Sequence, residues 1–227
     1  MSVIVLILLI IICLFTIYIF YKLFDKRGLF FANTILSILT FILSFKIGYI
    51  FKMNINLGII PFISVLTINY IYLIKYDKKN INSLLLTTTI TNAIMVLFLV
   101  IINYYIPAIT ETISINMQGT FETNYKIIIL YPIIMTLSEY IVIKLYTFIS
   151  NLQNNNILSL LLTYIITALI YTIIYYLLVY INILSIKDSL YLGITTYIIG
   201  LVIHIINIIF IYYLTKSKKV KKWEMSF

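Results

Sequence analysis

Long apolar runs separated by short polar breaks dominate the chain. A helix needs roughly 20 mostly apolar residues to cross the hydrocarbon core of a bilayer. Seven segments meet this requirement: residues 3–24, 29–51, 57–76, 83–106, 127–149, 157–182 and 189–214. They are apolar on all sides and too long for the alternating strands of a membrane β-barrel. The pattern therefore predicts an all-α, polytopic membrane helix bundle of about seven transmembrane helices.

The composition makes lipid the necessary solvent for these segments. Hydrophobic residues make up 63% of the 227 residues and charged residues only 10%, whereas a soluble domain is about half apolar and a quarter charged. One soluble core could not bury this much apolar surface, so we expect a single bundle and no separate soluble domain. The single cysteine, Cys13, excludes an internal disulfide framework and leaves too few thiolates for a zinc or iron–sulfur site. No cofactor is expected.

The first segment has two interpretations, a signal peptide or a retained helix. It lacks a basic region before Val3 and an A-x-A-like cleavage site, and it is longer than the usual apolar region of a signal peptide. We therefore expect residues 1–28 to form an additional N-terminal transmembrane helix with its basic loop.

Lysine and arginine are distributed unequally between the two ends of the predicted bundle. The loops after the first and third segments, together with the tail, contain Lys22, Lys26, Arg27, Lys75, Lys78, Lys79, Lys216, Lys218, Lys219, Lys221 and Lys222, whereas the opposite loops contain Lys52, Lys126 and Lys187. Cytoplasmic loops of membrane proteins carry the excess of basic residues. The pattern predicts a cell-membrane protein with its N-terminus outside and a basic cytoplasmic tail, residues 215–227. The net charge of +9 marks this face, and no nucleic-acid partner is expected.

One connection, from Pro107 to about Lys126, is long, and it lies outside in this orientation. A short helix in the interface and an ordinary solvated loop both fit it. The lysine-rich tail, which ends near Trp223, would also contact anionic lipid headgroups.

Glu139 is the most deeply placed charged residue of the predicted helices. At 1.5 Å per residue it lies about 18 Å into its helix, close to the bilayer midplane, where a charge costs roughly 2.5–3.5 kcal/mol on insertion scales. Glu139 is therefore neutral or paired, as a ligand or proton site or as part of a structural hydrogen bond. Lys46 and Lys144 lie nearer helix ends, and their long stems can carry the charge to the interface.

Polar residues of the last helix share one face. Thr196, Gly200, His204 and Asn207 recur at steps of four, four and three, which predicts a face that points into the bundle. Gly200 permits close helix packing, while His204 and Asn207 either line a polar cavity or make structural contacts. Other helices carry further small polar residues: Asn33, Ser37, Ser44, Thr67, Asn69, Thr88 and Asn92. Interhelical hydrogen bonds and an inward polar pathway both account for them.

Several local features occur in an order that a known family shares. They are Ala32-Asn33 before Lys46, Ile60-Pro61-Phe62-Ile63 before Tyr76-Asp77-Lys78-Lys79, Thr120-Phe121-Glu122-Thr123 before Lys126, Ser138-Glu139, the pair Thr167 and Thr172, and the late Asn207. From Leu29 onward the chain resembles a diverged member of the queuosine precursor transporter family, also described as vitamin uptake transporters. In this resemblance residues 29–214 are a six-helix transporter-like domain and the first helix is an addition. The family's acidic residues are replaced here, for example by Val142 and Tyr171, which puts the family's substrate or its transport activity in doubt.

The resemblance implies a transporter for a small nucleobase-like or vitamin-like solute. The expected binding residues are Glu139, His204, Asn207, Asn33 and Thr167, with tyrosine and phenylalanine rings as stacking surfaces. The alternative is a substrate-binding or scaffold membrane subunit of a multi-component importer, with a homo-oligomer or importer subunits as partners. The sequence contains no phosphate-binding P-loop and neither G-x-S-x-G nor H-E-x-x-H, so no ATP hydrolysis and no enzyme activity are expected.

Overall fold

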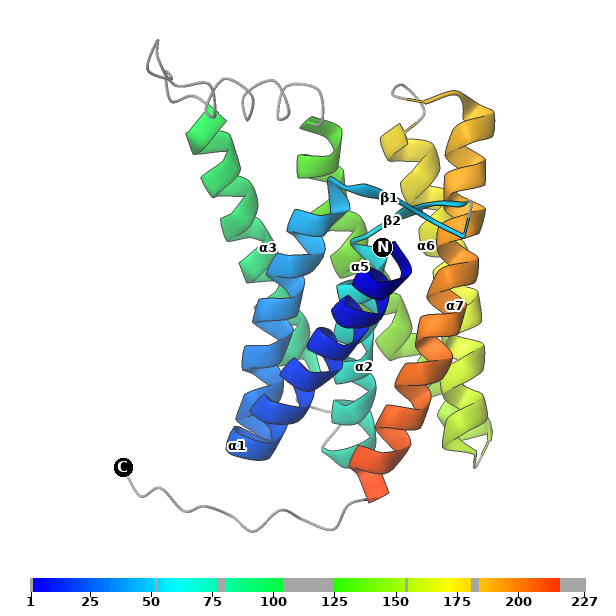
Figure 1. Ribbon diagram of the computed structural model, residues 1–227. Coiled ribbons are helices and arrows are strands. Elements are labelled where there is room, and N and C mark those ends of the chain that lie inside the picture. Colours follow the sequence, from blue (N-terminus) through cyan, green and yellow to red (C-terminus); the bar gives the residue numbers. More distant parts are fainter. Residues whose placement is uncertain are drawn as a thin grey trace.

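The computed structural model describes residues 2–51, 53–76, 81–103, 125–153, 155–180 and 184–216. These residues form a helical bundle with one small hairpin near one end (Figure 1). The elements are α1 (Ser2–Ser44), β1 (Ile47–Ile50), β2 (Met53–Asn56), α2 (Ile59–Lys75), α3 (Ile81–Asn103), α5 (Tyr125–Leu152), α6 (Asn156–Tyr180) and α7 (Ile186–Lys216). Among the described residues, helices α1, α3, α5, α6 and α7 are long and apolar enough to cross a membrane. The prediction of a helical, multi-pass membrane bundle is confirmed.

Helix α1 contains the first two predicted segments. Asp25 has φ 50° and ψ −125°, which is not helical, and the chain reverses there, so that the two arms of α1 run in opposite directions (Figure 1). A side chain at Gly28 would collide with the backbone carbonyl of Phe20 in the preceding arm, so only glycine allows this close approach. The described residues thus form six helices, and the structure does not support a count of about seven separate helices.

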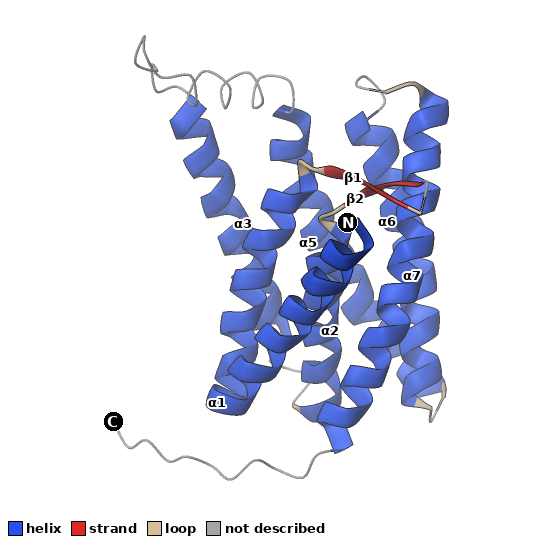
Figure 2. Cartoon of the chain, in the orientation of Figure 1, coloured by secondary structure: helices blue, strands red, loops and turns tan. Residues whose placement is uncertain are grey.

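The hairpin corrects the predicted end of the second segment. Residues 29–51 were expected to be helical throughout, but α1 ends at Ser44 and strands β1 and β2 pair antiparallel, Ile47 opposite Asn56 and Ile50 opposite Met53. Figure 2 shows that these strands are confined to one end of an otherwise helical chain. The apolar residues of β1 extend the hydropathy signal of the helix, although Ile and Tyr favour strands as well. Lys46 consequently lies beyond the helix and not within a span.

Helix α2 is the central helix of the bundle. Every residue from Ile59 to Leu73 is buried, and α2 packs against α1, α5 and α7. Its 17 residues extend about 26 Å, less than the roughly 30 Å of the hydrocarbon core. A helix enclosed by other helices can carry polar side chains on several sides, because each side faces protein.

Five of the nine basic residues in the described part of the chain lie at one end of the bundle. The reversal of α1 and the C-terminal ends of α2 and α7 lie at this end (Figure 1), which we call the basic end. It carries Lys22, Lys26, Arg27, Lys75 and Lys216. The segments for which an interfacial helix and a basic tail were predicted lie largely outside the described residues.

Two side-chain contacts fasten the reversal of α1 to the end of α2. The hydroxyl of Tyr76 donates a hydrogen bond to Oδ1 of Asp25, and Nζ of Lys75 donates one of 2.8 Å to the hydroxyl of Tyr21. Burial and, to a smaller extent, the bond to Asp25 raise the pKa of Tyr76 well above its ordinary value. A tyrosine hydroxyl is protonated at physiological pH in any case, and the raised pKa extends its donation to Asp25 to more alkaline pH.

Candidate functional site

Glu139 lies at the centre of a buried hydrogen-bond network. It is wholly buried in α5, and its Oε2 accepts hydrogen bonds from Nδ2 of Asn69 on α2 (3.1 Å) and from Oγ1 of Thr88 on α3 (3.2 Å). Nδ2 of Asn33 on α1 donates to the same Thr88 oxygen at 2.6 Å. This Glu139 cluster, formed by Asn33, Asn69, Thr88 and Glu139, connects four helices.

The Glu139 cluster is only partly satisfied. Oε1 of Glu139, Oδ1 of Asn33 and Oδ1 of Asn69 are buried and have no hydrogen-bond partner in the described part of the chain. The two groups that do bond Glu139, an amide and a hydroxyl, are uncharged. Buried polar atoms without partners are rare in native proteins and call for an explanation such as a bound molecule. The cluster therefore has free acceptors for the N–H or O–H groups of a ligand.

A second cluster surrounds the one histidine. The ring of His204 on α7 stacks on Tyr164 of α6, with centroids 3.9 Å apart and planes at 13°, and it lies 5.7 Å from the ring of Tyr70 on α2. Asn207, one turn further along α7, donates from Nδ2 to Oγ1 of Thr67 at 2.8 Å. These residues, Thr67, Tyr70, Tyr164, His204 and Asn207, form the His204 cluster.

The predicted inward face of the last helix is confirmed. Thr196, Gly200, His204 and Asn207 are all buried. Gly200 lies against the hydroxyl of Tyr164, where a side chain would collide, so the small residue allows the tyrosine to reach His204. The backbone of Leu160 lies within reach of the His204 ring, but neither ring nitrogen makes a hydrogen bond of normal geometry with a described residue. The hydroxyl of Tyr164 has no partner among the described residues.

Helix α2 connects the two clusters. Thr67 contacts α7 and Asn69 contacts α5, and residues two apart point about 200° from each other around a helix axis. The ring of Tyr70, which belongs to the His204 cluster, also contacts Tyr146 of α5, with ring centroids 5.5 Å apart. The polar side chains of α2 are thus distributed to opposite sides of the central helix.

Thr167 lies on an aromatic face of α6. Tyr164, Thr167, Tyr171 and Tyr175 recur at steps of three, four and four and are all buried. Oγ1 of Thr167 has no partner in the described residues, and no described hydrogen bond links it to either cluster. Tyr171 stacks on Phe62 of α2 with ring centroids 4.8 Å apart. This face continues the aromatic surface of the His204 cluster toward the hairpin.

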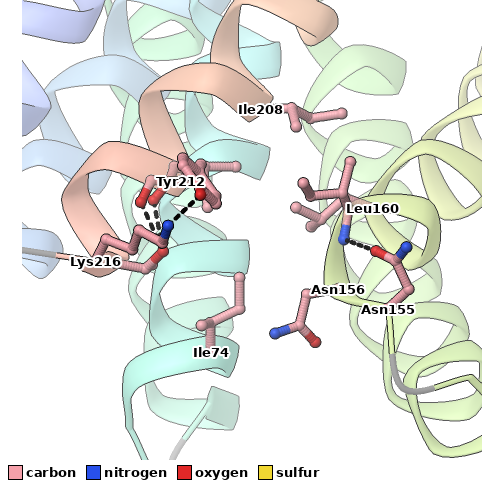
Figure 3. A pocket seen from close by; sticks show the side chains of 10 residues that line it. Ile74, Asn155, Asn156, Leu160, Ile208, Tyr212 and Lys216 are labelled. Atoms are coloured by element: carbon pink, nitrogen blue, oxygen red, sulfur yellow. Dashed lines mark hydrogen bonds between the residues drawn. The ribbon is translucent and has the colours of Figure 1, made fainter.

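A groove opens at the basic end between α2, α6 and α7 (Figure 3). Its volume is about 520 Å³, and its lining includes Asn155, Leu160, Ile208, Tyr212 and Lys216. Leu160 and Ile208 each lie one helical turn closer to the basic end than Tyr164 and His204, respectively. The groove therefore leads from the basic end toward the stacked pair of the His204 cluster.

The hairpin lies toward the opposite end of the bundle, and Asn56 makes its main side-chain contacts. The amide Nδ2 of this buried residue donates to the carbonyl of Ser44 (2.9 Å) and to the hydroxyl of Tyr180 (3.1 Å). Its backbone N–H donates to Oγ1 of Thr196 at 3.2 Å, and its Oδ1 accepts from the N–H of Gly58 at 2.8 Å. Asn56 thereby joins the hairpin to α1, α6 and α7.

The structure brings together most of the site residues predicted from the sequence, in two groups. Glu139 and Asn33 belong to one cluster, and His204 and Asn207 belong to the other. Thr167 is buried as well, but its hydroxyl makes no described hydrogen bond to either cluster. Sequence reasoning missed Asn56 and Tyr164. The steps of three, four and four from Tyr164 through Thr167, Tyr171 and Tyr175 were a signal that Tyr164 faces inward. Asn56 lay in a break between two predicted helices, and no contact was predicted for it.

Comparisons with known proteins add no relatives to this description. No family model matches the chain, and no curated protein and no solved structure matches it.

Proposed function

We propose that this protein is an integral membrane transporter for a small, flat, nucleobase-like or vitamin-like solute, as the resemblance to queuosine precursor transporters implies. The observation that carries the proposal is the unsatisfied polar interior around α2. Oε1 of Glu139, both nitrogens of His204 and Oδ1 of Asn207 are buried without well-formed hydrogen bonds to described residues. Unpaired buried polar atoms lower the stability of a bundle, so a membrane protein that only had to be stable would not need them.

The chemistry of the two clusters matches a heteroaromatic solute. Such a ring presents N–H donors, ring-nitrogen or carbonyl acceptors, and two apolar faces. Glu139 supplies an acceptor for N–H groups, His204 supplies a donor and an acceptor, and Tyr70 and Tyr164 supply faces for stacking. Because Tyr164 now stacks directly on His204 at 3.9 Å, a ring would bind there by displacing one of the two.

The two ends of the bundle differ in the way that alternating access requires. The groove of about 520 Å³ leads toward the His204 cluster from the basic end, whereas near the opposite end Asn56 joins the hairpin to α1, α6 and α7. These features support an inward-open conformation, provided that the basic end is cytoplasmic.

We also propose that the chain crosses the cell membrane seven times, with the N-terminus outside. The opposite directions of the two α1 arms support two separate crossings, and the gathering of basic residues at one end supports a cytoplasmic location for that end. Crossings by α2, α3, α5, α6 and α7 complete the seven.

Ligand screening followed by a matched pair of variants tests the transport proposal. Purified protein in detergent is titrated calorimetrically with purines, deazapurines and vitamins, and uptake of any compound that binds is measured in transport-deficient cells. Glu139→Gln should weaken binding and uptake at least tenfold, because the amide places an N–H where the solute donates. His204→Phe keeps an aromatic ring against Tyr164 but removes both nitrogens, and it should also abolish binding.

Asp188→Asn is the control, because Asp188 is an exposed carboxylate whose partner is the adjacent Ser185. It should leave binding and uptake unchanged. Equal uptake by wild type and Glu139→Gln would remove Glu139 from the mechanism. Co-purification of ATPase and coupling subunits, with no uptake by the chain alone, would favour the importer-subunit alternative.

A further inference from the structure

The lining of the groove at the basic end changes from polar to apolar along the bundle. It includes Lys216 and Ile208 on α7, and Asn156 and Leu160 on α6. Figure 3 shows Lys216 and Asn156 on opposite sides of the opening. Ile157, which also lines the groove, is 43% exposed, so the groove is open to the surroundings of the bundle. None of the residues of the Glu139 or His204 cluster lines it.

The helix lengths place the two parts of this lining at different depths of a bilayer. Half of a hydrocarbon core is about 15 Å thick. Measured from the middle of α7, Lys216 lies about 22 Å along the axis and Ile208 about 10 Å. Measured from the middle of α6, Asn156 lies about 18 Å and Leu160 about 12 Å along the axis. With the helix middles at the bilayer centre, the polar part lies at the level of the headgroups and the apolar part at the level of the acyl chains.

The rim of the groove, formed by Asn155, Asn156, Tyr212 and Lys216, is rich in hydrogen-bond donors. Nζ of Lys216 donates to the hydroxyl of Tyr212, which leaves two of its three N–H groups and the phenol O–H for a ligand. Oδ1 of Asn155 accepts from two backbone N–H groups at the start of α6, at 3.1 and 3.3 Å, so its Nδ2 remains as a donor. Among the described residues no acidic side chain lines the groove, and four further lysines follow within six residues of Lys216 in the sequence. The rim therefore complements an anionic group with several acceptor oxygens.

We propose that this groove binds an anionic phospholipid from the leaflet at the basic end, with its phosphate at Lys216 and Asn156 and an acyl chain against Leu160 and Ile208. Basic pockets between transmembrane helices can hold anionic headgroups, and hydrogen bonds from a lysine to a phosphate are charge-assisted. A water-soluble anion would fit the rim but would leave the apolar part of the groove in contact with water, which is unfavourable. Lipid binding here does not require transport, although a bound lipid and a transported solute would compete for the groove.

Quenching of tryptophan fluorescence by brominated acyl chains tests for this lipid. The reporter is Ile157→Trp in a Trp223→Phe background, because Ile157 is an exposed lining residue and Trp223 is the one native tryptophan. The full chain in phosphatidylcholine vesicles is given increasing fractions of brominated phosphatidylglycerol, or of phosphatidylcholine with the same brominated chains. The ratio of the two half-quenching fractions is the preference for the anionic lipid.

Phe148→Trp is the matched reporter outside the groove. Phe148 is 62% exposed and lies about 14 Å from the middle of α5, while Ile157 lies about 16 Å from the middle of α6. General enrichment of anionic lipid around the basic end affects both reporters. The preference at Ile157→Trp should be about five times that at Phe148→Trp, which corresponds to about 1 kcal/mol for a lysine near an anionic headgroup.

Two variants of the Ile157→Trp reporter assign the preference to the rim. Lys216→Gln removes the charge and should lower the preference about fivefold, to the level at Phe148→Trp. Lys22→Gln removes the same charge from an exposed lysine at the same end of the bundle but outside the lining, so the preference should stay at the value of the unchanged reporter.

Three results would overturn the proposal. Equal preferences at Ile157→Trp and Phe148→Trp would show that the groove selects no anionic lipid, and this comparison needs no change to the rim. Equal losses in Lys216→Gln and Lys22→Gln would assign the preference to general surface charge. Recovery of fluorescence on addition of excess glycerol 3-phosphate, which carries the phosphate without acyl chains, would show that the groove takes a soluble anion.

Discussion

Asn69 and Glu139 are joined by a hydrogen bond of 3.1 Å, in which the amide of Asn69 donates to Oε2 of the carboxyl group. Both residues are completely buried, and the bond connects the central helix α2 with α5. Asn69 is one of two donors to that oxygen, and Thr88 is the other. The central helix is therefore held by polar contacts as well as by apolar packing.

Asn69→Leu should lower the stability of the bundle. Leucine has a similar size but leaves Glu139 with one donor, and an unsatisfied buried polar group costs about 1–3 kcal/mol. The midpoint of thermal unfolding in detergent should fall accordingly. Thr87→Val is the control, since Thr87 is half-buried and its side chain bonds the carbonyl of Ser83 in its own helix. Equal midpoints for the two variants would show that the bond contributes nothing.

Gly200→Ala should disturb the His204 cluster through Tyr164. The added methyl group would collide with the tyrosine hydroxyl, and overpacking typically costs about 1–3 kcal/mol. The double variant Gly200→Ala with Tyr164→Phe removes the colliding oxygen and should recover most of the thermal stability.

Gly193→Ala is the matched control on the same helix. Its methyl group would lie 3.3 Å from the ring of Tyr176, a contact that a small shift relieves, so its unfolding midpoint should stay near that of wild type. A double variant no more stable than Gly200→Ala alone would contradict the assigned contact.

The sequence was sufficient to predict the helices but not the places where they are interrupted. Helices α5, α6 and α7 begin and end within a few residues of the predicted segments, because length and apolarity alone determine a membrane span. The reversal at Asp25 was predicted as a break between helices, and there the structure continues α1 on both sides of one non-helical residue. The hairpin was missed because β1 is apolar and follows a helix directly, so hydropathy shows no boundary at Ser44.

The candidate site was predictable only where spacing along one helix was informative. His204 and Asn207 were assigned to one inward face from helical periodicity, and they share it. Their partners Tyr164 and Thr67 lie on other helices, and nothing local identifies which of 21 tyrosines stacks on the histidine. Contacts between helices depend on the packing of the bundle, which a single sequence does not reveal.

Asn56→Ala should loosen the end of the bundle where the hairpin lies. The change removes the side-chain bonds to Ser44, Tyr180 and Gly58, and the loss should be about 2–4 kcal/mol for several buried hydrogen bonds. Hydrogen exchange of the backbone amides of β1 and β2 should accelerate more than exchange in α2.

Asn54→Ala provides a close comparison in the same strand. Its side chain is exposed, and the contact with Thr195 uses only the backbone carbonyl of Asn54. Exchange in the hairpin should remain at the wild-type rate. Equal acceleration in both variants would assign the effect to the strand in general and not to Asn56.

Cysteine labelling decides the number of crossings. In a Cys13→Ser background, a membrane-impermeant maleimide added to intact cells should label Val3→Cys and Lys187→Cys, because the proposed topology places the start of α1 and the start of α7 outside. Arg27→Cys should react only after the membrane is opened. Protection of Val3→Cys in intact cells, with labelling at Lys187→Cys, would show that the first arm of α1 does not cross and that the chain has six crossings.

The enclosure of α2 has a consequence for how this sequence can change over time. Most helices of the bundle present one side to lipid, where one aliphatic residue replaces another with little effect. Positions that tolerate substitution should therefore recur about once per helical turn. In α2, every side chain from Ile59 to Leu73 is buried against other helices, so no such periodic pattern of tolerated positions is expected. Among diverging descendants of this chain, the shortest helix should therefore be the most slowly changing one.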